Sequence, residues 1–314
     1  MDDFDGLPDS LVLQIINSIS EVKTLARLRS VSRRFNSLVP QAEFLLLRVD
    51  CIVSPEADSE ALLPSLFRSF IRSIHEIFKF SNSEASPKAA LSGTRSKNHS
   101  PVEILSRFNR ILDLRMELPA GDLKLENGVS VKWRAEFGRT LRSCVILGFR
   151  EQEEDVGDFP GGLKTRVVWT ISALIAASAR HYLLREVVKD HTELRQLQLY
   201  DREGEGVVVM NGDGLRECRR FDWEGDRSNG TFECGSSNRT LVPNVRMKMR
   251  HAPRVRLGNR WALGATLVVV RPVSDSDICG DAELALGAFE SGDYVDAINE
   301  LLKGNSYLLE MNSF

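Results

Sequence analysis

The side chains that most often carry out chemistry are scattered along this chain of 314 residues. Even His181 and His191, which flank one expected helix, are ten residues apart and do not share a turn at ligand spacing. No nucleophile elbow, zinc-protease motif or phosphate-binding loop motif occurs. We therefore expect no catalytic residues, and packing or surface roles for the five histidines, which are His75, His99, His181, His191 and His251.

Two glycine-rich turns and the cysteines also fail to indicate a cofactor site. Neither Gly204–Gly206 nor Gly212–Gly214 leads into a helix with a Lys-Ser/Thr pair, so we interpret both as tight hairpin turns. The five cysteines are odd in number and widely separated, and none forms a Cys-x-x-Cys pair. That spacing argues against a disulfide framework and against a structural zinc site. The sequence thus predicts no cofactor and no metal.

Basic side chains alternate along one predicted strand, within residues 244–257. Alternation places them on one face of the strand and Val245, Met247 and Met249 on the other. One interpretation is a docking surface for an acidic or phosphorylated segment of a substrate, because the arginine fork binds phosphate with two hydrogen bonds. The other is a solvated strand face paired with acids such as the 151–158 run. The candidate substrate-binding residues are Arg246, Lys248, Arg250, Arg254 and Arg256.

Composition narrows the class of protein. The 41 Lys and Arg against 44 Asp and Glu give a net charge of −3, which argues against a polybasic nucleic-acid binder. The mean hydropathy is −0.19, and the longest apolar candidate, Val167 to Ala179, is too short for a membrane span and predicts a buried helix. The chain starts Met-Asp-Asp, unlike a secretory signal. We therefore expect a nuclear and/or cytoplasmic location, no membrane and no nucleic acid, with about two domains.

The N-terminal residues predict a small helical module. Leu7-Pro8-Asp9-Ser10 is typical of a helix start, and three short apolar stripes at helical spacing follow before Pro40. Three helices of about ten residues each bury too little surface to be stable alone, so a neighbour must complete their core. Residues 56–80 predict an amphipathic helix, and the Ser-, Lys- and Pro-containing stretch 81–101 predicts a flexible loop suited to phosphorylation.

Beyond residue 102, strands and helices are expected to alternate, which predicts an α/β fold. Irregular leucine-containing strands give it a degenerate leucine-rich-repeat-like character. Trp133, Trp169 and Trp261 are expected in the core, whereas Trp223 lies in a polar stretch. The predicted strands are Ile111–Leu118, Cys144–Phe149, 194–199, Val207–Met210, 244–257 and 263–271; the predicted helices are Lys132–Leu141, Val167–Asp190 and Glu283–Leu302, the last broken near Gly292.

The spacing within residues 7–38 resembles an F-box. Leu7-Pro8, the apolar stripe, the run Arg29 to Phe35 and the closing Leu38 fall where F-box sequences carry the corresponding residues, with Phe35 at a position that is often Trp. F-box domains bind a Skp-type adaptor, which links them to a cullin and a RING subunit. The resemblance therefore implies a partner that completes the small helical core. The residues it assigns to the adaptor are Leu7, Pro8, Leu11, Ile15, Ile16, Ile19, Leu25, Val31, Ser32 and Phe35.

A longer resemblance connects the whole chain with a small plant family that includes the auxin-up-regulated F-box proteins. The segments that carry it are Phe35–Pro40, Leu197–Asp201, Ala265–Pro272 and Ser306–Phe314. It implies a non-catalytic substrate-receptor subunit of a cullin-based ubiquitin ligase, linked to hormone-controlled growth, that recruits an unknown protein substrate. Two alternatives remain open, a non-ligase scaffold with the adaptor and a small-molecule (hormone) sensor.

The domain organisation expected from these patterns has four parts. Residues 1–45 form the F-box, and residues 46–80 form a helical linker packed on it. Residues 81–101 form the flexible loop, and residues 102–314 form the α/β domain that holds the substrate.

Overall fold

The computed structural model describes residues 6–49, 104–119, 121, 123, 128–152, 162–220, 239–274, 280–289 and 292–314. The helix expected over 56–80, the loop expected over 81–101 and Trp223 lie outside the described residues. The chain divides into two compact units. Unit 1 comprises Met1–Glu117 with Leu183–Arg195, and unit 2 comprises Leu118–Tyr182 with Gln196–Phe314.

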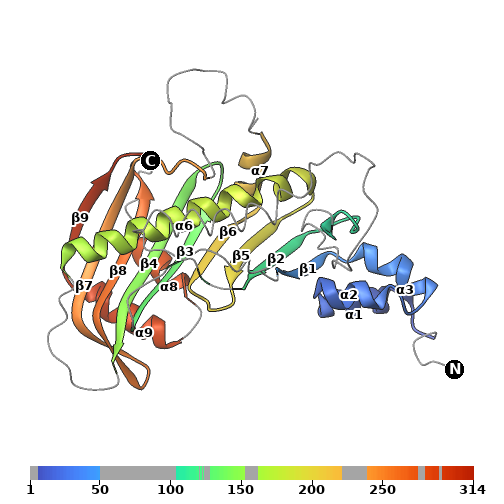
Figure 1. Cartoon of the computed structure of the whole chain (residues 1–314), viewed down its shortest axis with the longest axis horizontal. Helices are drawn as coiled ribbons and strands as arrows, with labels where there is room; N and C mark the ends of the chain where they lie inside the picture. The colour runs from blue at the N-terminus through green and yellow to red at the C-terminus, as the bar shows by residue number, and fades with distance from the viewer. Residues whose placement is uncertain are drawn as a thin grey trace, which may run out of the picture. The chain divides into compact units, whose positions relative to one another are not determined.

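Unit 1 begins with the expected helical module, shown in blue in Figure 1. Its helices are α1 (Asp9–Ile19), α2 (Val22–Leu28) and α3 (Arg33–Leu38), followed by the 3-10 turn η1 (Val39–Gln41). Ser20 closes α1 in the left-handed region, with φ of 52°, and Ser32 caps α3 by accepting a hydrogen bond from the Phe35 amide. Strand β1 (Phe44–Arg48) then pairs in parallel with β2 (Asp113–Leu118) from Phe44↔Asp113 to Arg48↔Glu117.

Hydrogen bonds join the helical module to β1 and to the residue before it. The Leu46 amide donates to the Ser20 carbonyl at 2.8 Å, and the Glu43 amide donates to Oδ1 of Asn17 at 2.9 Å. Apolar side chains from all three helices and η1 fill the space beneath them. The module's buried residues include Val12, Ile16, Val22, Leu25, Leu38 and Val39.

Unit 2 is built on a mixed sheet. Its strands lie in the order β5 (Gln196–Asp201), β6 (Gly206–Met210), β3 (Val129–Phe137), β4 (Leu141–Gln152), β8 (Arg260–Pro272), β7 (Val245–Leu257) and β9 (Ser306–Met311). The β3–β6 pair is parallel, while β5–β6, β3–β4, β4–β8, β7–β8 and β7–β9 are antiparallel. A leucine-rich-repeat-like solenoid would stack parallel strands, so that part of the expected fold is not confirmed.

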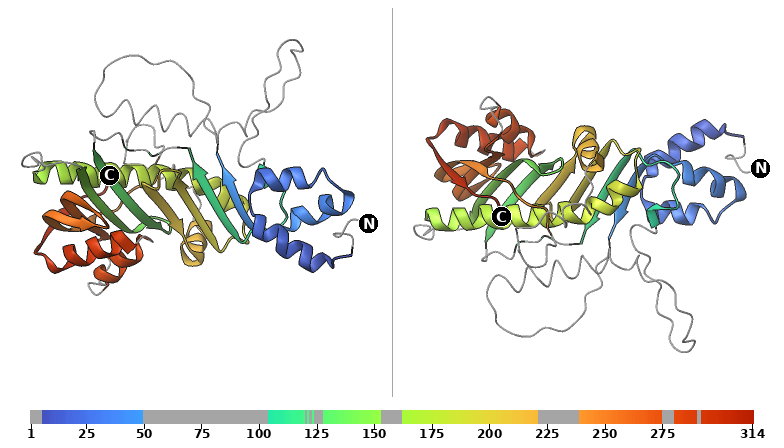
Figure 2. Two further views of the ribbon diagram at one scale, coloured as in Figure 1. Left: turned by 90° about the horizontal axis from the view of Figure 1, so that it is seen from below. Right: turned by 90° about the horizontal axis from the view of Figure 1, so that it is seen from above.

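Helices cover both faces of this sheet, as Figure 2 shows. The part of α6 (Leu163–Asp190) that belongs to unit 2 lies on one face, where the Trp169 ring fills the space above Gly148 of β4. Helices α8 (Asp281–Gly287) and α9 (Gly292–Lys303) cover the other face and pack on Val145, Leu147 and Phe149. Helix α7 (Gly212–Arg220) follows β6. The described residues therefore confirm a mixed α/β architecture.

Helix α6 is long and apolar enough by composition to cross a membrane, and 67% of its most apolar 18-residue window is buried inside the protein. Two of its buried polar side chains have partners there. Ser178 donates to the Thr240 carbonyl, and Arg180 forms an ion pair with Asp201 at 2.8 Å. These contacts are typical of the buried core helix expected from the sequence.

Two local predictions of secondary structure are wrong. Residues 132–137 lie in β3, residues 138–140 form a bend and residue 141 begins β4, so this segment is not a helix. The side chains of Val131, Trp133, Ala135 and Phe137 are buried at every second position, and that period of two is typical of a strand. Gly212–Gly214 is not a hairpin turn but the first turn of α7, where Asn211 caps the Gly214 amide at 2.9 Å.

Candidate functional site

Unit 1 exposes three large apolar side chains on one side of α1. Leu11 is 44% exposed, Ile15 40% and Ile19 36%. Because they are spaced by four residues, they lie on the same side of the helix. We call Leu11, Ile15 and Ile19 the apolar face. Val31, in the connection to α3, is 69% exposed. Contact between water and apolar side chains of this size is unfavourable. Burial of these side chains against a partner therefore lowers the free energy and stabilises the complex.

A second apolar stripe on the same helix points inward. Val12 and Ile16 of α1 and Leu25 of α2 are buried in the module. Of the residues expected to contact the adaptor, Ile16 and Leu25 therefore support the apolar face from behind and are not part of the surface. Pro8 and Ser32 are exposed, and Leu7 and Phe35 are half-buried. The sequence pattern missed Val12, although its spacing of four from Ile16 is a helical signal.

Arg34 joins the start of α3 to the start of α1. Its guanidinium forms an ion pair with Oδ1 of Asp9 at 2.7 Å and also donates to the Leu7 carbonyl. This contact holds the segment before α1 against α3, in which Phe35 lies. No local pattern pointed to Arg34, because its partner is 25 residues away in the sequence.

The basic strand residues lie mostly within ion pairs or stacked contacts. Arg246 pairs with Glu310 of β9 at 3.3 Å, and Lys248 pairs with Asp281 of α8 at 3.4 Å. The guanidinium of Arg254 stacks over the Trp261 ring, with 3.9 Å to its centroid. The strand has the two faces expected, and the pairs favour the second interpretation, a strand face paired with acids.

Several details of that strand differ from expectation. The acids are Glu310 and Asp281, while Glu151 pairs with Arg260 at 2.8 Å. Trp261 is 44% exposed rather than in the core, in contrast to the buried Trp133 and Trp169. Over Val245–Arg250, strand β7 lies between β8 and β9, so its backbone pairs on both sides there, whereas residues 251–257 pair with β8. The two remaining basic residues are Arg250, whose Nε and Nη1 are buried without a described partner, and Arg256, whose Nε donates to the Gly258 carbonyl.

A buried Cys-His contact in unit 2 has a packing role. Nδ1 of His181 lies 2.7 Å from Oγ1 of Thr240, its Nε2 lies 3.8 Å from Sγ of Cys218, and its ring stacks on Phe137 at 4.3 Å. Burial lowers the pKa of His181 to about 3 and raises the pKa of Cys218 to about 12, so both groups are neutral at physiological pH. A neutral thiol is a poor nucleophile. Within the described residues no cluster of three metal-ligating side chains occurs.

Comparison with known proteins identifies the family. F-box protein AUF2 of Arabidopsis thaliana is 47% identical over 328 residues, which cover 100% of this chain and 100% of AUF2. The chain belongs to the plant F-box protein family. F-box protein AUF1 of Arabidopsis thaliana is also 47% identical, over 341 residues and the full length of both chains. F-box protein At4g18380 of the same plant is 39% identical and matches over 94% of its length.

Neither a family model nor a solved structure matches this F-box protein. The full-length relatives carry the assignment, because the similarity extends through both units and is not confined to residues 7–38. The resemblance of the whole chain to plant F-box proteins is therefore confirmed. The exposed apolar face lies within the segment whose spacing resembled an F-box.

Proposed function

We propose that this F-box protein is a substrate-receptor subunit of an SCF-type ubiquitin ligase. It binds a Skp-type adaptor through unit 1 and, through that adaptor, a cullin and a RING subunit. Ubiquitin is then transferred to a protein held by the rest of the chain. The receptor needs no catalytic residue for this function, because holding the substrate raises the effective concentration of its lysines near the charged ubiquitin.

The observation that carries the proposal is the apolar face of α1 in a member of the F-box family. Leu11, Ile15 and Ile19 are exposed although the module they belong to has a small core of its own. A partner that covers these side chains would complete the module, and interfaces of this kind are apolar at their centre. We assign Pro8, Val31 and Phe35 to the border of the same interface, since Arg34 holds the starts of α1 and α3 together.

Co-expression of the full chain with a Skp-type adaptor tests this proposal. We expect the wild-type chain to co-purify with the adaptor and the Leu11→Glu/Ile15→Glu variant to lose it, because buried unpaired carboxylates are costly at an apolar interface. Leu308→Glu is the matched control: Leu308 is a similarly exposed leucine in unit 2, on β9. The circular dichroism spectra should be the same for all three proteins.

Two outcomes would contradict the proposal. One is a folded wild-type chain that does not retain the adaptor. The other is a Leu11→Glu/Ile15→Glu variant that retains it as well as the Leu308→Glu control does. Co-purification of a cullin in the same experiment separates the ligase receptor from the non-ligase scaffold, which would bind the adaptor alone.

The biological setting is a further part of the proposal. We place the protein in auxin-linked growth control and in the nucleus and/or cytoplasm. Its similarity to AUF1 and AUF2 supports the first of these statements. A fluorescent fusion of the full chain in plant cells, followed before and after auxin treatment, tests both.

A further inference from the structure

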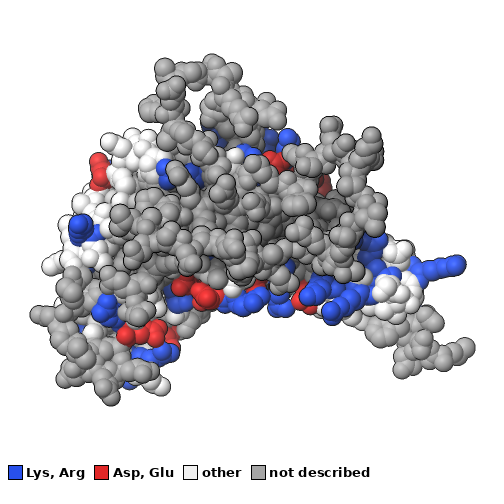
Figure 3. Space-filling view, viewed as in Figure 1, with Lys and Arg blue, Asp and Glu red and all other residues white. Residues whose placement is uncertain are grey.

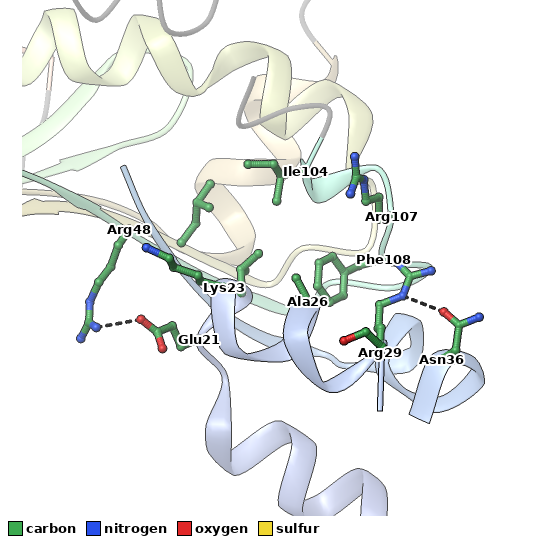
Figure 4. A pocket seen from close by; sticks show the side chains of 12 residues that line it. Glu21, Lys23, Ala26, Arg29, Asn36, Arg48, Ile104, Arg107 and Phe108 are labelled. Atoms are coloured by element: carbon green, nitrogen blue, oxygen red, sulfur yellow. Dashed lines mark hydrogen bonds and ion pairs between the residues drawn. The ribbon is translucent and has the colours of Figure 1, made fainter. Parts of the chain in front are cut away.

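Unit 1 contains a groove on a different set of residues from the apolar face. Its volume is about 990 Å³. It is lined by α2 and the residue that follows α2, by α3, by the end of β1, and by the turn at residues 104–108, as Figure 4 shows. No residue of α1 lines it. A protein that covers Leu11, Ile15 and Ile19 therefore leaves the residues of this groove outside its central contact.

The groove combines an apolar floor with a basic rim. Val22, Leu47 and Phe108 form the buried floor. Lys23, Arg29, Arg48 and Arg107 also line the groove, and Glu21 is the only acidic residue among its described lining residues. We call this surface the basic groove. Figure 3 shows blue side chains gathered over the F-box helices.

The negative charge of Glu21 in the basic groove is already compensated by a cation. Glu21 pairs with Arg48 at 2.9 Å, and a hydrogen bond from Thr24, together with the charges of Arg48 and Lys23, keeps the pKa of Glu21 below its usual value despite partial burial. Arg48 also reaches Glu117 at 3.3 Å. These contacts leave the carboxylate of Glu21 ionised and held toward Arg48.

Two cations of the basic groove have no described carboxylate in ion-pair contact. Nε of Arg29 donates to the neutral Oδ1 of Asn36 at 3.2 Å, which orients its guanidinium without compensating its charge. Lys23 is exposed and forms no ion pair within the described part of unit 1. The rim therefore presents uncompensated positive charge above an apolar floor.

The spacing of these cations matches an extended chain. Lys23 and Arg29 are six residues apart along α2 and its C-cap, which corresponds to about 9 Å at the rise of an α-helix. An extended peptide advances about 3.3 Å per residue and turns successive side chains to opposite faces, so carboxylates four positions apart share one face at about 13 Å, within reach of the two long cationic side chains. The side chain midway between them lies on the same face and points to the floor. A single small anion satisfies one cation and leaves the floor empty.

We propose that the basic groove binds an extended peptide segment of a partner protein with two Asp or Glu residues four positions apart and a large apolar residue midway between them. Charge complementarity supplies the orientation, and burial of the apolar residue supplies much of the affinity. This is a second docking surface on the F-box unit, separate from the face proposed for the adaptor.

A peptide array with the full chain tests this inference. The probes are fluorescein-labelled nine-residue peptides of leucine and serine with two aspartates separated by zero to five residues, and matched peptides with asparagine in place of aspartate. We expect the tightest binding at a separation of three residues, and binding that weakens as salt is raised. In the Lys23→Glu/Arg29→Glu variant, Kd should rise at least tenfold.

Arg27→Glu is the matched control, because Arg27 is exposed on the same helix and does not line the groove. We expect its Kd to stay within twofold of wild type. The Leu11→Glu/Ile15→Glu variant should also bind the peptides normally, which separates this inference from adaptor binding. The inference is overturned if aspartate peptides bind no better than asparagine peptides, or if the two variants on α2 behave alike.

Other occupants of the basic groove give distinct results. In one further variant, a flexible linker of about 20 glycine and serine residues replaces residues 50–103. If the peptides bind only to this variant, residues 50–103 of the chain itself occupy the groove. Displacement of the peptide by the Skp-type adaptor would assign it to the adaptor. Either result contradicts a site for a further partner.

Discussion

At the residue scale, unit 2 contains a buried pair of opposite charges beside a carboxyl that lacks such a partner. Arg180 and Asp201 are both buried and lie 2.8 Å apart, and Asp201 also accepts the Glu205 and Gly206 amides at 2.8 Å. Glu205 lies next to this pair. Its Oε2 is buried without a hydrogen-bond partner among the described residues. Burial, followed by the charges of Asp201 and Glu203, raises the pKa of Glu205 from 4.5 to about 7.

This environment makes the free energy of unfolding depend on pH. Between pH 4.5 and about 7 the folded state binds more protons at Glu205 than the unfolded state does, so stability falls as the pH rises through that window. We expect Glu205→Gln to flatten the decline and to be more stable than wild type at the upper end. Urea unfolding at a series of pH values measures this.

Glu300→Gln, on α9 of unit 2, is the control, because Glu300 is exposed and is not among the charges that act on Glu205. It should leave the slope of stability against pH close to that of wild type. Equal slopes for Glu205→Gln and wild type would contradict the elevated pKa.

Patterns of residues in the sequence predicted well which face of a strand a side chain lies on, but they predicted poorly which residue it pairs with. Alternation correctly separated Arg246, Lys248 and Arg250 from the apolar residues of β7, because a strand turns each successive side chain to the opposite face. Their actual partners could not be found in this way. Glu310 is 64 residues beyond Arg246, and only the pairing of β7 with β9 brings them together.

At the element scale, α1 has one apolar stripe for the core and another for the surface. Ile16 is fully buried, whereas Ile15 is 40% exposed. Ile16→Ala should therefore lower the free energy of unfolding of unit 1 by about 2–5 kcal/mol, through lost contacts and the cavity left behind. Ile15→Ala should change it by less than about 0.5 kcal/mol. Amide hydrogen exchange across α1 and β1 measures both.

The same pair of variants separates stability from binding. We expect Ile15→Ala to weaken adaptor binding although the module remains folded, as truncations near the centre of an interface do. A similar loss of exchange protection in Ile15→Ala and Ile16→Ala would show that α1 does not have the two faces described.

Element types were predictable where one period dominated. The long apolar helix α6 and the break between α8 and α9 follow the expected ranges. Residues 132–141 were assigned to a helix although Trp133, Ala135 and Phe137 recur at every second position. The charged residues between them suit an exposed helix face as readily as the polar face of a strand. The residue types therefore favoured the wrong element, whereas the period of two correctly indicates a strand.

At the scale of the whole molecule, the order of the strands could not be read from the sequence. Strand β3 pairs in parallel with β6, and β4 pairs with β8, which lies more than one hundred residues further along the chain. Alternating helices and strands suggested repeats of neighbouring parallel strands. The sheet is mixed because most of its strands pair in an antiparallel manner. Some of these strands are distant in the sequence and do not recur at a regular interval, so no repeat pattern predicts their pairing.

The division into units predicts where adaptor binding changes stability. The apolar face lies wholly in unit 1, so the adaptor should stabilise the folded state of that unit directly. At an adaptor concentration of about 100 times Kd, the linkage relation gives about 2.7 kcal/mol. Hydrogen exchange that proceeds through unfolding of α1 and α3 should then slow by about 100-fold.

Strands β4 and β8 of unit 2 provide the internal reference for that experiment, because they carry no residue of the apolar face. Their amides should exchange at the same rate with and without the adaptor. The Leu11→Glu/Ile15→Glu variant should show no change in either unit. Equal slowing in β4, β8 and α1 would mean that the two units unfold together, and slowing confined to β4 and β8 would place the adaptor on unit 2 and refute the assignment of the apolar face.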